Sequence, residues 1–136
     1  MAIIRSNLNN KTEKDKMSAL PQIFAAVTLV VIAQLFVKKG IDSLAFKGFS
    51  ERLVFTYFRL FLDPIFILGI VFYITATFFW LYALSKVDLT FAAPFLALTY
   101  VLILIGAWLF LGESISFLRV VGTLVVCFGL IIVSMS

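Results

Sequence analysis

The chain alternates between long apolar runs and short polar segments. The apolar runs cover residues 20–37, 64–84, 89–111 and 117–135. A helix rises about 1.5 Å per residue, so roughly 20 apolar residues cross the ~30 Å hydrocarbon core of a bilayer. Each run is near that length. The pattern therefore predicts an all-α membrane protein with four transmembrane helices.

Two polar segments set the expected division of the chain. Residues 1–19 are rich in Ser, Asn and Lys, which predicts a mobile polar tail before a four-helix transmembrane domain over residues 20–136. Pro21 suits the first turn of a helix, so the first span is expected to begin there and to stop at Lys38-Lys39-Gly40. Residues 41–62 mix charges with an apolar side, which predicts an amphipathic interfacial segment, either a simple connector or a functional element.

Short links determine the expected topology. Only four residues, 85–88, separate the second and third runs, and five, 112–116, separate the third and fourth. Links this short make neighbouring helices antiparallel, so both chain ends are expected on one side of the membrane. Lys and Arg are almost evenly divided between the two sides, so the positive-inside rule leaves the orientation open, with the basic tail favouring cytoplasmic ends.

Composition excludes several classes of function. Hydrophobic residues make up 63% of the chain and charged residues 13%, and the net charge is +4. With no His and a single Cys, no zinc, haem or iron–sulfur cofactor is expected. The chain has no nucleophile motif or phosphate-binding loop, so we do not expect an enzyme. Its basic residues flank apolar runs, which is typical of membrane anchoring rather than nucleic-acid binding.

Gln34 and Lys38 are the first candidates for a substrate site. They lie four residues apart and so share one side of the first helix. A Lys supplies charge and an amide supplies a directed donor, a combination that suits an anionic oxygen. The alternative is that Lys38 and its neighbour Lys39 simply extend toward the headgroups, and for Lys39 this is the preferred interpretation.

Pro94 and Glu113 are the other candidate site residues. Pro94 lies a few residues into the third span, where it removes a backbone hydrogen bond. Irregular backbone at membrane depth is tolerated where protein or a water-lined cavity satisfies it, so Pro94 indicates a nearby cavity. Glu113 follows Gly112 at the end of that span, where it is expected to face water or to pair with a base such as Arg119.

The last span carries Gly122 and Gly129 on one face. They lie seven residues apart, which is two helical turns. Small residues in register allow two membrane helices to approach closely. The pair predicts either a dimer interface or close packing within the same chain.

Several motifs resemble a known group of transporters. They are AQLFVKKG at 33–40, WLYALSKVDLTFAAPFLAL at 80–98, LGES at 111–114 and GTLVVCFGLIIVS at 122–134. Together they resemble the drug/metabolite transporter superfamily, in its EamA-like and small-multidrug-resistance-like four-helix branch. Within it, the pattern QLxxK at 34–38, AxPxLxL at 92–98 and Glu113 are most similar to the small subunits that flip undecaprenyl-phosphate-linked aminoarabinose.

The resemblance implies a carrier that works as a dimer. Small multidrug exporters place a carboxylate within the first span, and the corresponding residues 26–31 hold none here. We therefore expect a flippase-like carrier of a polyprenyl-phosphate-linked sugar or similar anionic amphiphile, surrounded by membrane lipid. Its partner would be a second copy or a similar small membrane protein, in a bacterial inner membrane. The alternatives are a small-molecule or multidrug exporter of the same superfamily and a non-catalytic membrane subunit of a glycosyltransferase system.

Overall fold

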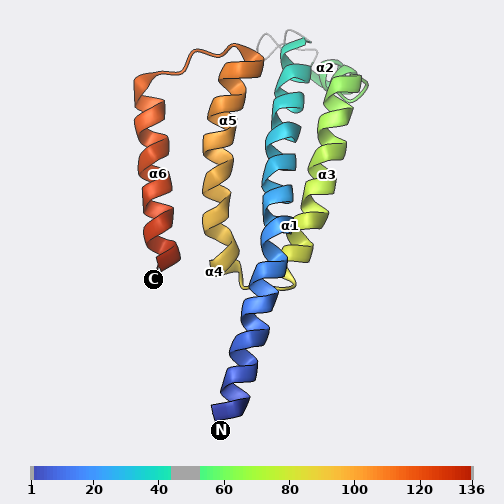
Figure 1. Ribbon diagram of the computed structural model, residues 1–136. Helices are drawn as coiled ribbons and strands as arrows, with labels where there is room; N and C mark the ends of the chain where they lie inside the picture. Colours follow the sequence, from blue (N-terminus) through green and yellow to red (C-terminus); the bar gives the residue numbers. More distant parts are fainter. Residues whose placement is uncertain (1, 44–52, 136) are drawn as a thin grey trace.

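The protein is a bundle of long antiparallel helices (Figure 1). The computed structural model describes residues 2–43 and 53–135, and the side chains of residues 7–43 and 57–133. Within these ranges all regular structure is helical, in the order α1 (Ala2–Ser43), α2 (Leu53–Leu60), α3 (Pro64–Leu84), α4 (Leu89–Ala92), a 3₁₀ turn η1 (Ala93–Phe95), α5 (Leu96–Leu111) and α6 (Phe117–Met135). The all-α prediction is thus confirmed for the described residues.

Three helical stretches are long and apolar enough to cross a membrane. They are Asn7–Ser43, Pro64–Leu84 and Leu89–Leu111, and the last combines α4, η1 and α5. The fourth predicted span is the apolar helix α6. Its bounds match the prediction, but it is shorter than the other three stretches. Its 19 residues extend about 28 Å, close to the thickness of a bilayer core. The protein is therefore an integral, multi-pass membrane protein, and a spanning position for α6 remains a prediction.

Helix α1 differs most from its prediction. It runs without a break from Ala2 to Ser43, so Pro21 lies inside the helix rather than at its start. Just before Pro21 the segment holds Lys11, Lys14 and Lys16 with Glu13, all good helix formers, and this allows the helix to extend toward the N-terminus. Ala19, placed in the tail by the sequence, is fully buried in the core. Whether the rest of residues 1–19 is mobile stays a prediction.

The predicted interfacial segment is only partly covered. Residues 44–52 lie outside the described residues, and α1 takes up residues 41–43. The remaining part contains α2, which ends just before the start of α3. There Asp63 caps α3, because its carboxylate Oδ1 accepts a hydrogen bond of 2.9 Å from the Phe66 N–H. Pro64 occupies the first turn, where its missing N–H costs no hydrogen bond.

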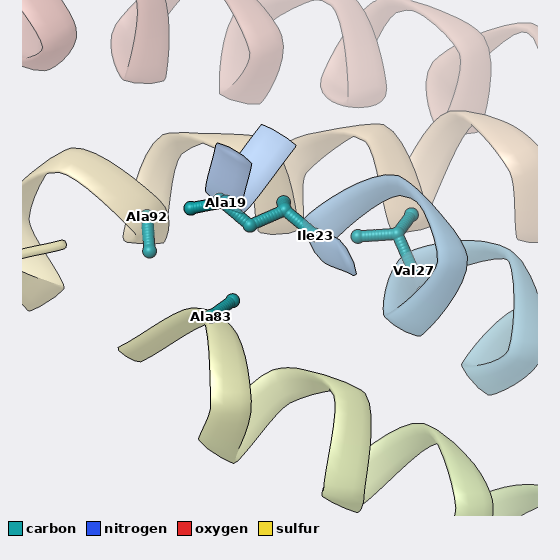
Figure 2. Close-up of a cluster of buried hydrophobic side chains, with 5 residues drawn as sticks. All are labelled: Ala19, Ile23, Val27, Ala83 and Ala92. Carbon is teal, nitrogen blue, oxygen red and sulfur yellow. The ribbon is translucent and has the colours of Figure 1, made fainter. Parts of the chain in front are cut away.

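The helices pack unevenly. Helix α1 contacts α3 along much of its length and α5 less extensively, whereas α6 contacts mainly α5. The core cluster lies where α1, α3 and α4 meet, and Figure 2 shows its five fully or nearly fully buried residues, Ala19, Ile23, Val27, Ala83 and Ala92. Small side chains dominate because apolar lipid gives no hydrophobic drive for association, so close backbone packing replaces it.

Glycines mark the closest helix contacts. A Cβ at Gly69 of α3 would lie 2.9 Å from the backbone N of Val37 in α1, and one at Gly40 would lie 2.9 Å from Phe66 Cβ. A Cβ at Gly106 of α5 would meet the end of the Leu35 side chain at 2.8 Å. These three glycines therefore allow α1 to approach both α3 and α5. Gly40 was predicted to end the first span, but α1 continues past it to Ser43.

The topology agrees with the short links. Helices α3 and α4 are joined by residues 85–88, and α5 and α6 by residues 112–116. Successive long helices run in opposite directions, and the N- and C-terminal ends both lie toward the lower end of the bundle in Figure 1. Placing both ends on one side of a membrane remains a prediction that this arrangement supports.

Candidate functional site

Gln34 lines a cleft at mid-height in the bundle. The cleft has a volume of about 430 Å³ and is bounded by α1, α3 and α5. Half of its lining is small or aliphatic, and the other half carries polar or aromatic groups: Gln34, Tyr73, Thr77, Trp80, Thr99 and Tyr100. Polar groups at this depth cost free energy in a membrane and are usually kept for binding or transport. The cleft is the strongest candidate for a substrate site.

The cleft opens sideways between two helices. Helices α3 and α5 each pack against α1, but within the described chain they scarcely contact each other. Helix α1 therefore forms the floor of the cleft, and α3 and α5 form its walls. Tyr73 on one wall and Tyr100 on the other are 47% and 59% exposed. In a bilayer this opening would face the lipid.

Thr99 stands out among the helical threonines. Thr12, Thr28, Thr75, Thr77 and Thr123 each donate their hydroxyl to the carbonyl four residues earlier, at 2.8–2.9 Å. The Thr99 hydroxyl oxygen is covered by surrounding atoms yet has no hydrogen-bond partner among the described residues. An unpaired polar atom of this kind costs about 1–3 kcal/mol. Thr99 therefore leaves hydrogen-bonding capacity available beside the cleft.

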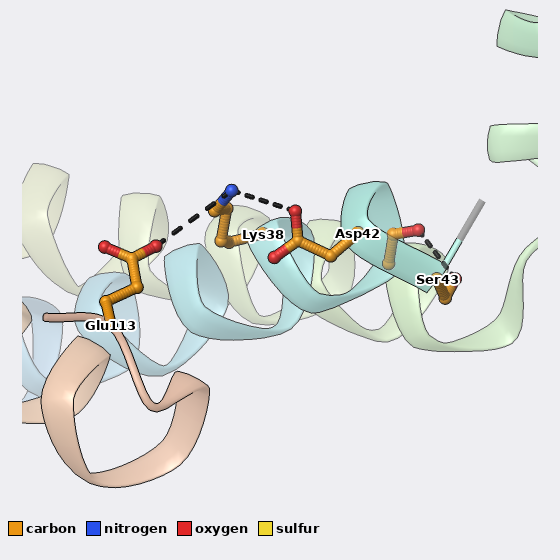
Figure 3. A network of polar contacts seen from close by, with 5 residues as sticks. Lys38, Asp42, Ser43 and Glu113 are labelled. Atoms are coloured by element: carbon orange, nitrogen blue, oxygen red, sulfur yellow. Dashed lines mark hydrogen bonds and ion pairs between the residues drawn. The ribbon is translucent and has the colours of Figure 1, made fainter. Parts of the chain in front are cut away.

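Lys38 lies outside the cleft, in a polar cluster near the end of α1 (Figure 3). Its ammonium Nζ is 2.9 Å from Asp42 Oδ1 and 4.0 Å from Glu113 Oε1. The side chains of all three residues are between 38% and 51% exposed. The structure thus brings together two of the predicted site residues, Lys38 and Glu113, at the end of the bundle.

The turn after α5 positions Glu113. Gly112 has a φ of 64°, a left-handed conformation that glycine adopts without strain, and it ends the helix. The backbone N–H of Glu113 then donates to the Ala107 carbonyl at 3.2 Å. This reversal directs Glu113 toward α1. Its basic neighbour is therefore Lys38, whereas the sequence had suggested Arg119.

The remaining candidates lie elsewhere. Pro94 lines a separate hollow of about 400 Å³ between α5 and α6, together with Phe24 and Cys127. The cavity that Pro94 was expected to indicate is therefore not the one that Gln34 lines. Lys39 borders an apolar hollow of about 210 Å³ with Phe110. Gln34 and Lys38 share one side of α1, as predicted, but only Gln34 contributes to the cleft.

A second polar region lies at the opposite end of the bundle. Its hollow, of about 270 Å³, is formed by α1 and the α3–α4 link and is lined by Asp15, Lys16, Lys86 and Asp88, among others. The Lys16 ammonium lies 5.2 Å from the centre of the Phe91 ring, within the range of a cation–π contact. Charged groups thus border the bundle at both ends, with the uncharged cleft between them.

Gly122 and Gly129 face open space. A Cβ built at either position would meet no atom within 4 Å. Close packing of this glycine pair within the chain, one of the two alternatives from the sequence, is therefore not observed. Its use in a dimer remains a prediction.

These features define a helical membrane protein with a polar cleft halfway along its bundle, open between α3 and α5. Comparison with known proteins agrees with this class. The chain matches the EamA-like transporter family over residues 3–135 and belongs to that family. The resemblance carried by its motifs is confirmed.

One relative is close enough to be informative. The chain is 30% identical over 108 residues to a probable 4-amino-4-deoxy-L-arabinose-phosphoundecaprenol flippase subunit, ArnF, of Serratia proteamaculans (strain 568). The match covers 77% of this chain and 83% of the relative. No solved structure gives a significant match.

Proposed function

We propose that the chain is a carrier subunit that moves a polyprenyl-phosphate-linked sugar, or a similar anionic amphiphile, between the leaflets of a membrane. The observation that carries the proposal is the polar cleft that opens sideways between α3 and α5. An amphiphile crossing a bilayer needs a polar place for its headgroup while its tail stays in hydrocarbon, and a cleft open to lipid provides both. The transporter family and the flippase relative support the same activity.

Lys38 is the residue proposed to receive the phosphate. It lies one turn from Gln34, about 6 Å along the helix axis. Its closer ion pair, at 2.9 Å, is with Asp42, and its contact with Glu113 is long, at 4.0 Å; all three side chains are partly exposed, so exchanging the Glu113 carboxylate for a phosphate costs little. Asp42 and, more weakly, Glu113 act as the resting counter-ions of Lys38. Pro94 acts indirectly, through the 3₁₀ turn that precedes the Thr99 and Tyr100 side of α5.

A proton-coupled drug exporter is the competing activity. Its usual mechanism requires a carboxylate at membrane depth, whose pKa desolvation can bring near neutrality. Among the residues that line the described cleft there is no Asp or Glu. This favours a carrier of an anionic amphiphile over the exporter.

We propose that the working unit is a dimer with a second copy or with a similar small membrane protein. Helix α6 contacts mainly α5, and its face with Gly122 and Gly129 has space for a closely packed helix. The relative is itself named as a subunit. The same relative supports a location in a bacterial inner membrane.

A transport assay tests the proposal. Membrane vesicles from cells that make the full chain retain any partner subunit, and a fluorescent polyprenyl-phosphate sugar reports its leaflet through quenching by an external reagent. We expect vesicles with the protein to move the lipid faster than vesicles without it. Equal rates in the two preparations would overturn the proposed function.

Lysine variants then test the site. Lys38→Ala should reduce transport at least tenfold, and Lys38→Arg should retain part of it, because a charge-assisted hydrogen bond is about twice as strong as a neutral one. Lys39→Ala should have a smaller effect, since Lys39 lies about 100° away around the helix. Lys14→Ala, on the exposed N-terminal part of α1, is the matched control. Equal small losses for Lys38→Ala and Lys14→Ala would remove Lys38 from the site.

A further inference from the structure

The mid-depth cleft has an unusual chemical character for the site of an anionic substrate. The rings of Tyr73, Trp80 and Tyr100 line it together with the amide of Gln34 and the hydroxyl of Thr99. No Lys, Arg, Asp or Glu is among its described lining residues. Its chemistry is therefore neutral hydrogen bonding combined with aromatic surface.

A bare phosphate does not fit this lining. Moving an anion into a low-dielectric site is unfavourable unless a cation accompanies it, and the cations of the bundle lie at its two ends. Lys38 belongs to the cluster with Asp42 and Glu113, and Lys16 belongs to the hollow at the other end. The cleft itself must receive an uncharged part of the substrate.

A sugar ring suits the lining well. Its hydroxyl groups need hydrogen-bond donors and acceptors around the rim. The Gln34 amide provides both, through its NH₂ group and its carbonyl oxygen. Its faces carry C–H groups, which pack on the apolar faces of Tyr and Trp while the polar ends of these side chains remain available for hydrogen bonds. The cleft volume of about 430 Å³ lies within the range of ligand sites.

The unpaired Thr99 hydroxyl supplies the most specific contact. Each of the other described threonines in the middle of a long helix donates its hydroxyl to a carbonyl of the preceding turn. The Thr99 hydroxyl oxygen is buried and has no hydrogen-bond partner among the described residues. Rotation about χ1 between staggered positions can turn this hydroxyl toward the cleft. A substrate hydroxyl would then satisfy a group that is otherwise unpaired.

We infer that the cleft recognises the sugar ring of the lipid-linked headgroup, through Gln34, Thr99 and the three aromatic rings, while the phosphate stays outside at Lys38. This inference rests on the proposed function and adds a division of labour within the site. Sugar recognition and phosphate recognition are assigned to different residues, of which Gln34 and Lys38 are the nearest to each other, about one helical turn apart. The two contributions can therefore be separated by substitution.

Binding in nanodiscs tests the division. The chain has two tryptophans, so Trp108→Phe leaves Trp80 as the only indole and makes its fluorescence report on the cleft. Trp108 is 60% exposed and does not line the cleft, which makes this background suitable. The probes are polyprenyl phosphate, the same lipid carrying one neutral sugar, and the corresponding deoxy-sugar lipid.

We expect the sugar lipid to change Trp80 emission and to bind at least tenfold more tightly than polyprenyl phosphate. Thr99→Val keeps the side-chain shape and removes the hydroxyl, and it should weaken sugar-lipid binding roughly tenfold while leaving polyprenyl-phosphate binding unchanged. Tyr100→Phe is a second variant that removes only a hydroxyl. Thr28→Val is the control, because Thr28 lies on the exposed side of α1 and bonds to the Phe24 carbonyl.

Each outcome decides between the two proposals. If both lipids bind equally, with a Lys38-dependent affinity, the sugar inference is overturned while the proposed function stands. If Thr99→Val and Tyr100→Phe weaken both lipids alike, the cleft takes the phosphate and the division of labour is wrong. If neither lipid binds in nanodiscs and the vesicles with the protein also move the lipid no faster than those without it, both proposals fail.

Discussion

Replacing Gly69 by alanine would test the closest contact in the bundle. Gly69 lies in α3 against α1, and an added Cβ would be 2.8 Å from Val37 Cγ2, 2.9 Å from Val37 N and 3.0 Å from the Ala33 carbonyl oxygen. Two of these three atoms belong to the backbone and have no freedom to rotate away. We therefore expect α1 and α3 to separate.

The size of the effect follows from these distances. Ordinary Cβ contacts begin at 3.4 Å, so the two helices must move apart by about half an ångström along a shared interface. Overpacking of this kind costs about 1–3 kcal/mol. Alanine recovers about 0.5–1 kcal/mol because it restricts the unfolded backbone more than glycine does. The expected net destabilisation for Gly69→Ala is about 1 kcal/mol, within a range of about 0–2.5 kcal/mol.

Two other glycines provide matched controls. At Gly106, the new Cβ would meet the end of the Leu35 side chain at 2.8 Å, and that side chain can change rotamer. At Gly129 it would meet nothing within 4 Å, and alanine is still small enough for helix association. We expect Gly106→Ala to lie within about 1 kcal/mol of the parent protein, and Gly129→Ala to be neutral or slightly stabilising.

Unfolding in mixed detergent and sodium dodecyl sulfate micelles measures these differences. Trp80 fluorescence in the Trp108→Phe background follows the transition, because Trp80 packs against the core cluster. The variants are ranked by the mole fraction of sodium dodecyl sulfate at which half of the protein is unfolded. A Gly69→Ala midpoint equal to that of Gly129→Ala would show that α1 and α3 are not in close contact, and the packing described here would be wrong.

Three further predictions concern topology, capping and association. With Cys127 replaced by Ser, cysteines introduced at Ser6 and Ser136 should react with a membrane-impermeant maleimide from the same side, and labelling from opposite sides would contradict four spans. Asp63→Ala should destabilise the protein by about 1 kcal/mol through loss of the α3 cap, and Asp63→Asn should restore most of it, as measured by the same detergent unfolding. Gly129→Leu should lower the crosslinked dimer fraction in detergent without reducing membrane insertion, and an unchanged fraction would exclude this face from association.

Helix positions followed closely from local signals in the sequence. The bounds of α3 and α6 agree with their apolar runs, and Gly112 ends α5 as a glycine at a helix end predicts. The predicted start of α1 was wrong because proline favours the first turn of a helix but does not always mark it. Packing of Ala19 in the core, which depends on α3 and α4, extends the ordered helix beyond that position.

The candidate site was only partly predictable. The sequence indicated Gln34, Lys38 and Glu113 from their chemistry, and the structure places the last two together. The sequence offered no reason to choose Thr99 or Tyr73, because a lone hydroxyl within an apolar run is common in membrane helices. The signal that could have indicated Thr99 is its position five residues after Pro94, beside an irregular turn.

Hydropathy determined that the chain inserts into a membrane, roughly where its helices lie and which of them run antiparallel, since these depend on the length and composition of each segment alone. It did not determine which side of each helix faces inward. Helices α3 and α5 are apolar on all sides, and lipid solvates an apolar face as well as a neighbouring helix does. Only tertiary packing decided that Gly69 and Gly106 face α1 and that Gln34, Thr99 and three aromatic rings line one cleft, because close backbone approach and the grouping of polar side chains require three helices to meet.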